Sequence, residues 1–477
     1  MGMALVWFRD DLRLDDQPAL RAALDRGLVP VPVYIHAPEE EGAWAPGAAS
    51  MAWRRRSLQA LGAELERRGS RLLVLHGPSL GTLQAVAALT GAEAVLWTRR
   101  YEPAVEQRDA RIKRELRRGG LHAESFNGAL LFEPWELETK QGDPYRVFTP
   151  FWKSALAHWR TPSTWDAPAR LPVPDEGNTP HSLPLEHLLP VPRPEWDAGF
   201  WQRFTPGETG AREALARFLE GAVHGYASAR DFAAEAGTSR LSPHLHFGEV
   251  SVRRVAAAVL EAGDAITSAD RDRFLAELGW REFAHHVMHH YPHVPERNLD
   301  ARFEDFVWAR PLRAKLQAWQ QGRTGVPIVD AGMRELWHTG WMHNRVRMVV
   351  ASWLTKHLRM HWSHGARWFW DTLVDADLAN NTQGWQWTAG TGADAAPYFR
   401  VFNPVSQARK FDPDGAYIAR WVPELADLPV PARFAPWEHP ELLRRHAPHY
   451  PRTPQVDLAE GRAAALEAFA ALRRAPL

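Results

Sequence analysis

Two segments of the sequence carry an unusual density of polar and aromatic side chains. The first is 341–348, Trp-Met-His-Asn-Arg-Val-Arg-Met, and the second is 375–387, Asp-Ala-Asp-Leu-Ala-Asn-Asn-Thr-Gln-Gly-Trp-Gln-Trp. Buried charges persist only when they are paired, and buried amides only when they are hydrogen-bonded. So many polar groups beside so many indoles indicate a site for a large, flat ligand with polar edges, and we interpret that ligand as a flavin.

Within these segments we expect Arg347 and Asp375 to form a buried ion pair, which needs a specific polar neighbour such as a flavin ring edge. Asn381 is neutral and can both donate and accept hydrogen bonds, so it can follow a protonation change on a flavin nitrogen. The alternative is that Asn380 and Asn381 only form a turn. Asn344 is expected to share a helix face with Met348, on a helix that begins at Trp341.

A third segment, 271–283, has the spacing of a helix that gathers an acid, an indole and a cation on one side. Glu277, Trp280, Arg281 and Ala284 are three or four residues apart and so share a face. That face suits a flat partner bearing carbonyl groups, stacked on the indole and hydrogen-bonded by the acid. The alternative is an exposed Glu–Arg pair beside a core tryptophan.

The run Thr238-Ser239-Arg240-Leu241-Ser242-Pro243 precedes an apolar helix start. Hydroxyl and backbone N–H groups at a helix entry can bind phosphate, because the orphan donors and the helix dipole both favour an anion. Simple capping of the helix is the alternative.

Four histidines, His285, His286, His289 and His290, form two pairs with a spacing of four residues. Such pairs can chelate a metal, but the sequence lacks His-Glu-x-x-His and has no cysteine to complete a site. We therefore expect no metal and favour histidines at the surface or facing DNA.

Composition limits the classes of protein to which this chain can belong. It has 477 residues, zero formal net charge, no cysteine and 23 tryptophans. Any contact with nucleic acid must then come from a local basic patch. The early charges after Met1 do not fit a secretory signal, and no apolar run has membrane-spanning length, so we expect a cytoplasmic protein.

Short apolar runs alternate with helical patterns at the start of the chain. Strands are expected at 5–8, 30–36, 71–76 and 94–97, and helices at 51–68 and 103–118. This order predicts an α/β Rossmann-like domain with a parallel sheet, although the Gly-x-Gly-x-x-Gly turn is missing. The expected domains are an α/β domain at 1–130, a Pro-rich linker at 131–205 and an all-α domain at 206–477. Helices of the last are expected at 208–224, 250–262, 267–291, 311–321, 329–338, 341–358 and 364–374.

At these motifs the chain resembles the DNA photolyase and cryptochrome family. The resemblance runs from 6–13, Val-Trp-Phe-Arg-Asp-Asp-Leu-Arg, through 385–387 to 397–404, Pro-Tyr-Phe-Arg-Val-Phe-Asn-Pro. It is strongest to microbial photolyases that repair cyclobutane pyrimidine dimers. The resemblance implies FAD in the helical domain and light-driven electron transfer to a flipped-out lesion in ultraviolet-damaged DNA. We also expect a monomer, because repair needs one protein per lesion and the sequence shows no oligomerisation seam.

The resemblance also assigns residues to these roles. The implied FAD contacts are Tyr226, Thr238, Ser239, Arg240, Leu241, Ser242, Phe274, Arg347, Asp375, Ala376, Asp377 and Asn381. The implied catalytic residues are Glu277, Asn344, Met348 and Asn381. The implied lesion and DNA contacts are Glu277, Trp280, Asn344 and Trp387, with Arg230, Arg281, Arg345, Arg400 and Gln407. Trp385, Trp362 and Trp308 match the chain of tryptophans through which the flavin is photoreduced.

Several alternatives stay open. Val105 stands where folate-binding members carry Asn, so the antenna is methenyltetrahydrofolate, a deazaflavin or nothing. Competing functions are a cryptochrome-type blue-light receptor, a (6-4) photoproduct photolyase, and an electron-transfer flavoprotein without a nucleic acid partner. Asn344 and Arg345 after Trp-Met-His disfavour the second, and the Glu277 face disfavours the third.

Overall fold

The computed structural model describes residues 2–172, 179–395 and 400–474. The chain divides into two compact units. The first comprises residues 1–145, 149–224 and 239–292, and the second comprises 146–148, 225–238 and 293–477. Each unit is described by itself.

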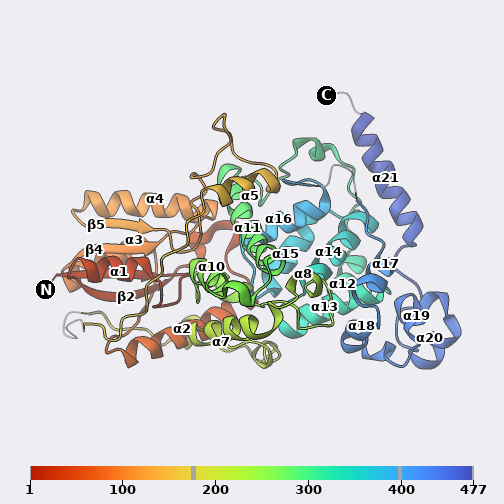
Figure 1. Ribbon diagram of the computed structural model, residues 1–477, viewed down its shortest axis with the longest axis horizontal. Helices are drawn as coiled ribbons and strands as arrows, with labels where there is room; N and C mark the ends of the chain where they lie inside the picture. The colour runs from red at the N-terminus through yellow and green to blue at the C-terminus, as the bar shows by residue number, and fades with distance from the viewer. Residues whose placement is uncertain (1, 173–178, 396–399, 475–477) are drawn as a thin grey trace. The chain divides into compact units, whose positions relative to one another are not determined.

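The first unit contains a five-stranded parallel sheet in the order β3-β2-β1-β4-β5 (Figure 1). The strands are β1 (Met3–Phe8), β2 (Val29–His36), β3 (Leu73–His76), β4 (Ala92–Thr98) and β5 (His122–Phe126). The middle strand β1 is almost wholly buried, and the apolar core on the sheet includes Leu5, Trp7, Val33 and Val95. Near-continuous apolar runs such as these are typical of parallel strands that are covered on both faces.

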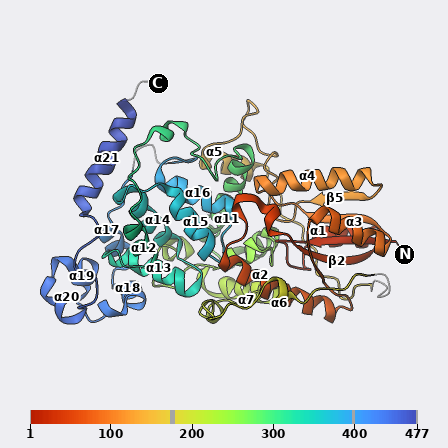
Figure 2. The same cartoon turned by 180° about the vertical axis from the view of Figure 1, so that it is seen from behind.

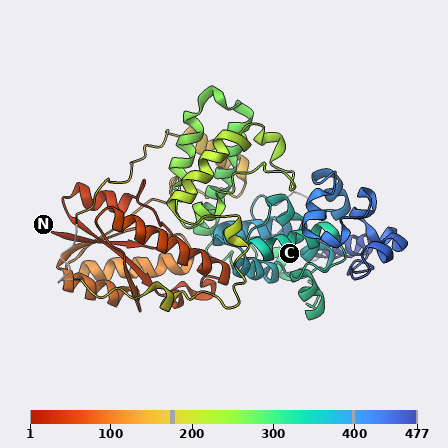
Figure 3. The same cartoon turned by 90° about the horizontal axis from the view of Figure 1, so that it is seen from below.

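Helices follow the strands in the order expected of a parallel sheet. They are α1 (Pro18–Asp25), α2 (Ala48–Arg67), α3 (Ser79–Thr90) and α4 (Pro103–Arg118). In Figure 3 the strands fan out between red and orange helices. The same unit continues with α7 (Glu208–Arg217), α9 (Ser242–His246), α10 (Val252–Glu261) and α11 (Ser268–His290).

The second unit is helical in the residues that the structure describes (Figure 2). Its site-bearing helices are α8 (Tyr226–Ala229), α13 (Pro327–Thr339), α14 (Asn344–Ser352), α15 (Trp362–Thr372) and α16 (Leu378–Ala389). Helix α14 leads into a π-helical turn, η7 (Trp353–His357). Helices α12 (Arg313–Gln320), α17 (Pro404–Phe411) and α21 (Leu458–Arg474) belong to the same unit.

The predicted fold class is confirmed: a parallel α/β sheet precedes a helical part of the chain. Among the strands of the sheet and the helices that follow them, α1, α3 and β5 were not predicted, and neither were α16, α17 or α21 in the second unit. The helix expected at 341–358 in fact begins at Asn344, after the cap residue His343. The expected linker 131–205 contains α5 (Phe148–Ala157) and α6 (Leu185–Leu188), and the proposed domain limits stay a prediction.

Candidate functional site

Helix α16 carries most of the second polar segment. Asp377 is its N-cap, and one carboxylate oxygen accepts hydrogen bonds from the backbone and the side-chain amide of Asn380, each at 2.7 Å. The interpretation of Asn380 and Asn381 as a turn is therefore wrong, because both lie in the first turn of a helix that Asp377 nucleates. Asn381 is half-buried, and its Nδ2 donates to the carbonyl of Ala366 at 3.0 Å. Its Oδ1 remains the group available to a ligand edge.

The predicted ion pair between Arg347 and Asp375 is confirmed. Nη2 of Arg347 lies 2.8 and 3.0 Å from the two carboxylate oxygens, and Nε donates to the carbonyl of Met342 at 2.8 Å. Asp375 is buried and Arg347 is partly exposed. The guanidinium is held at two points, so it fixes the carboxylate beside the start of α16.

His343 caps α14 by accepting a hydrogen bond from the backbone of Arg345 at 3.2 Å, and burial lowers its pKa to about 4. Asn344 is exposed at the first position of the helix, and Met348 is half-buried one turn later. Arg345 donates to Asp231 at 2.8 Å and lies 4.3 Å from the ring centre of Phe411. Arg345 is thus anchored on two sides within this unit.

The three tryptophans proposed for electron transfer all lie in the second unit. Trp385 and Trp362 are fully buried, whereas Trp308 is half-buried. The ring of His361 lies 5.1 Å from that of Trp308 and 5.2 Å from that of Trp362, centre to centre. Trp308 is therefore connected to Trp362 through a single imidazole, which supports its place in the chain.

Glu277, Trp280 and Arg281 lie on helix α11, and the predicted helix is confirmed. Glu277 is half-buried and lies 3.8 Å from Arg273, and Trp280 packs edge-on against Phe283. Arg281 donates to the carbonyl of Ala129 at 2.8 Å, so part of its hydrogen-bonding capacity is used within the first unit.

The segment 238–242 leads into the short helix α9. The capping interpretation is wrong, because the cap residue is Leu241 and makes no side-chain capping bond. Ser239 Oγ instead lies 3.4 Å from the backbone N–H of Leu241, and Arg240 has a positive φ of 53°. Elsewhere among the proposed FAD contacts, Tyr226 begins α8, Ala376 is buried, and Phe274 packs on Phe218 at 4.6 Å. Thr238 belongs to the second unit.

The histidine cluster differs from the expectation of surface residues. His285 and His286 are buried, and burial lowers the pKa of His286 to about 4. His286 and His290 both lie within hydrogen-bonding distance of the carbonyl of Pro134, at 2.9 and 3.0 Å. Among the residues that the structure describes, no three His, Asp or Glu side chains are grouped so that they could hold a metal ion.

The proposed DNA contacts differ in exposure. Arg400 is exposed, whereas Gln407 and Trp387 are half-buried. Arg230 is only 8% exposed and lies 5.5 Å from the ring centre of Tyr226, so its charge faces the protein interior. Residues 397–399 of the shared motif lie outside the described residues. None of the helices in the described residues is both long and apolar enough to cross a bilayer.

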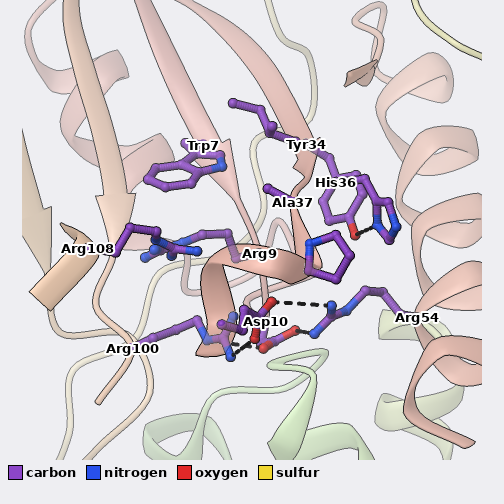
Figure 4. Close-up of a pocket in the computed structure, with 12 residues that line it drawn as sticks. Trp7, Arg9, Asp10, Tyr34, His36, Ala37, Arg54, Arg100 and Arg108 are labelled. Carbon is purple, nitrogen blue, oxygen red and sulfur yellow. Dashed lines mark hydrogen bonds and ion pairs between the residues drawn. The ribbon is translucent and has the colours of Figure 1, made fainter. Parts of the chain in front are cut away.

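A small cavity lies at the carboxyl ends of β1 and β2 in the first unit (Figure 4). Its charged lining includes Asp10, Glu41, Arg54 and Arg100, which pair in a closed square with N–O distances of 2.8, 3.7, 3.2 and 2.7 Å. Burial opposes ionisation of Asp10, but the charges of Arg100 and Arg54 outweigh it and hold the pKa of that carboxyl well below its usual range.

The cavity enclosed beside these four charges is small. The cavity measures about 20 Å³, whereas sites for drug-sized ligands span roughly 300–1,000 Å³. The cavity is therefore far smaller than a site for a ligand of that size.

Three buried residues of the site were missed by sequence reasoning. Gln386 bonds through its side chain to the backbone of residues 294–299, Asn298 accepts a hydrogen bond from Trp362, and Lys356 donates to the carbonyl of Ala389 at 2.6 Å. Burial holds the pKa of Lys356 well below its usual range. Gln386 stands between two tryptophans, which is a local signal for a buried amide, whereas Asn298 and Lys356 have polar neighbours in the sequence and offer no such signal.

Comparison with known proteins gives consistent results. Residues 4–174 match the family model described as DNA photolyase, and residues 274–471 match the FAD binding domain of DNA photolyase. A deoxyribodipyrimidine photo-lyase of Agrobacterium fabrum is 45% identical over 474 residues, 98% of each chain. Cryptochrome-1 of Arabidopsis thaliana is 38% identical over 98% of this chain and 70% of its own length. A crystal structure of a bacterial class III photolyase from Agrobacterium tumefaciens covers 100% of this chain and 98% of its own, with a TM-score of 0.95 and 44% identity.

Proposed function

Because this chain belongs to the DNA photolyase and cryptochrome family, we propose that it repairs cyclobutane pyrimidine dimers in DNA, using light and an electron from reduced FAD. The observation that carries this proposal is the 45% identity to a deoxyribodipyrimidine photo-lyase over 98% of both chains.

The donor set around α16 fits FAD. The Arg347–Asp375 pair offers a fixed carboxylate, Asp377 lies beside it, and Asn381 has a free amide oxygen on the same helix. These groups suit the hydroxyls and ring edge of a flavin, which present both donors and acceptors. When bound and reduced, FAD supplies an electron that blue or near-ultraviolet light can excite. The protein's part is to orient it and to exclude water.

The remaining polar and aromatic residues are assigned to the lesion. Glu277 is proposed to hydrogen-bond a pyrimidine carbonyl and to stabilise charge that develops there, and Trp280 and Trp387 to stack on the bases. Asn344 and Met348 are also proposed to contact the lesion. The lesion must leave the duplex to reach a buried cofactor, and base flipping is the general solution for such enzymes. Binding to phosphates through arginines such as Arg345 and Arg400 should weaken as salt rises.

A cryptochrome-type light receptor is the second candidate, because Cryptochrome-1 is 38% identical over 98% of this chain. The two functions share one fold and differ in their effect on damaged DNA. Repair consumes the lesion, whereas a receptor leaves DNA unchanged.

The deciding experiment uses ultraviolet-irradiated oligothymidine and the reduced holoprotein, in blue light and in darkness. We expect the dimers to disappear only in light. Glu277→Ala should slow the repair about a hundredfold, since such contacts to developing charge typically contribute this much. Glu261→Ala changes an exposed glutamate on α10 and is the matched control. Persistence of the dimers in light, with flavin bound, would favour a receptor or, if (6-4) lesions are repaired instead, a (6-4) photolyase.

A further inference from the structure

The indole of Trp362 makes one defined polar contact. The side chain is 0% exposed, and its Nε1 donates to Oδ1 of Asn298 at 2.8 Å. Asn298 is itself only 5% exposed. A buried indole N–H normally finds a partner, but the chemical nature of that partner matters when the indole loses an electron.

The amide of Asn298 is held in one orientation. Its Nδ2 and its backbone N–H both donate to Oε1 of Glu304, at 3.0 and 3.3 Å, so its oxygen must face Trp362. The next residue, Leu299, donates its backbone N–H to Oε1 of Gln386 at 3.0 Å. Gln386 follows Trp385 on α16, so the segment that contacts Trp362 is tied to the helix that carries Trp385.

An oxidised indole is a much stronger acid at Nε1 than a neutral one. A carboxylate, imidazole or water at hydrogen-bond distance would take the proton, whereas an amide oxygen is a very weak base. If the proton leaves, the positive charge is lost and the neutral radical is a poorer oxidant of the next indole. The partner of Trp362 therefore decides whether charge can move on to Trp308.

We propose that Asn298 is a positioning residue that keeps the proton on oxidised Trp362, so that the charge passes to Trp308, and that Glu304 stabilises the cation through the amide. This inference rests on the proposed role of the three tryptophans. In this step one electron moves from Trp308 to the Trp362 radical cation, Trp362 is restored with its N–H intact, and Trp308 becomes the cation. No proton moves at Trp362. The flavin, photoexcited in its oxidised form, is the primary oxidant.

The test is transient absorption of the oxidised holoprotein after a blue-light flash, because cation and neutral tryptophan radicals have different visible spectra. Asn298→Asp places a base at the same position. We expect a neutral radical on Trp362, a solvent deuterium isotope effect on its formation, and about a tenfold lower yield of oxidised Trp308. Asn298→Leu removes the hydrogen bond without adding a base, so the cation spectrum should persist.

Two further variants separate the possible outcomes. Trp362→Phe should abolish the long-lived radical; if it does not, the proposed tryptophan chain is wrong. If Trp362→Phe abolishes the radical but Asn298→Asp gives the spectrum and yield of the wild type, the chain stands and the role of Asn298 is overturned. Glu304→Gln changes an exposed residue and should fold; it should slow formation of the Trp362 cation about threefold with its proton retained, and an unchanged rate contradicts the role of Glu304.

Discussion

The side-chain carbonyl of Gln386 accepts a hydrogen bond from the backbone N–H of Leu299 at 3.0 Å. The other half of the amide donates to the carbonyls of Val294 and Arg297, at 2.7 and 2.9 Å. Gln386 is 1% exposed, so removing its amide leaves buried backbone N–H and C=O groups without a hydrogen-bond partner. Gln386→Leu should lower the free energy of unfolding by about 3 kcal/mol, measured by urea denaturation.

Gln383 provides the control for this prediction. It lies on the same helix, is half-buried, and donates to the carbonyl of Ala393 at 3.0 Å. Gln383→Leu should cost about 1 kcal/mol. Equal losses for the two variants would contradict the role assigned to Gln386.

Gly365 on α15 leaves room for the indole of Trp385. A Cβ at this position would lie 2.0–2.5 Å from three ring carbons of Trp385. Gly365→Ala should therefore displace the indole, lower stability by roughly 1–3 kcal/mol and reduce the yield of tryptophan radicals after a flash. Gly384→Ala, on the neighbouring helix with no atom within 4 Å of the new Cβ, should instead raise stability by roughly 0.5–1 kcal/mol. A normal radical yield in Gly365→Ala would show that the indole relaxes without loss of function.

The Arg347–Asp375 pair should be needed to retain flavin. Asp375→Asn removes the charge that the guanidinium faces, and Arg347→Lys replaces a two-point contact with a single ammonium. Both variants should weaken FAD binding by roughly tenfold or more, measured by flavin release during dialysis. Arg367→Gln breaks an exposed pair with Glu296 and should leave the flavin content unchanged. Full flavin retention in Asp375→Asn would exclude the pair from the cofactor site.

Acid should destabilise the protein through its buried histidines. Burial lowers the pKa of His286, His343 and His357 to about 4 in the folded state, against 6.5 for an ordinary histidine. The unfolded chain therefore binds more protons, so stability is fully present above pH 6.5 and is lost as pH falls towards 4. Melting temperatures across this range should show the loss. His357→Phe retains a ring against Trp353, which lies 4.7 Å away, and should make the slope shallower; an unchanged slope contradicts this contribution.

Asp330 should affect the pH dependence of stability in the direction opposite to that of the buried histidines. Burial raises its pKa from 3.8 to about 6, although Thr324, Gly325 and Tyr450 donate hydrogen bonds to it. The folded state then binds more protons between pH 3.8 and 6, so this residue's contribution to stability falls as pH rises through that window. Asp330→Asn should therefore depend on pH more steeply than the wild type between pH 4 and 6. A shallower dependence in melting experiments would contradict the raised pKa.

Sequence reasoning found the elements with a strong local pattern. The apolar runs of β1, β2 and β4 and the ion pair of Arg347 with Asp375 follow from residue types alone. Strand β5 was missed because His122–Phe126 has a single fully buried residue and no apolar run. The start of α14 was placed at Trp341 because the capping role of His343 depends on backbone geometry that the residue pattern does not reveal.

The contacts of Asn298 and Lys356 could not be predicted, for a different reason. Each joins residues far apart in the chain, Asn298 to Trp362 and Lys356 to Ala389. The local sequence pattern does not show which distant backbone segment will pack against a given side-chain amide or amine. Only the tertiary packing shows that these polar residues are satisfied.

The closed square of Asp10, Glu41, Arg54 and Arg100 constrains how this part of the molecule can evolve. Replacing one member leaves a buried charge without its counterpart, at a cost of about 3–5 kcal/mol. That is a large fraction of the stability of a typical domain. A single charge-removing substitution at any of these four positions should therefore be eliminated by selection. A related protein that opens this cavity to a ligand must therefore replace one acid and one arginine together. In related sequences, substitutions at these four positions should occur in acid–base pairs.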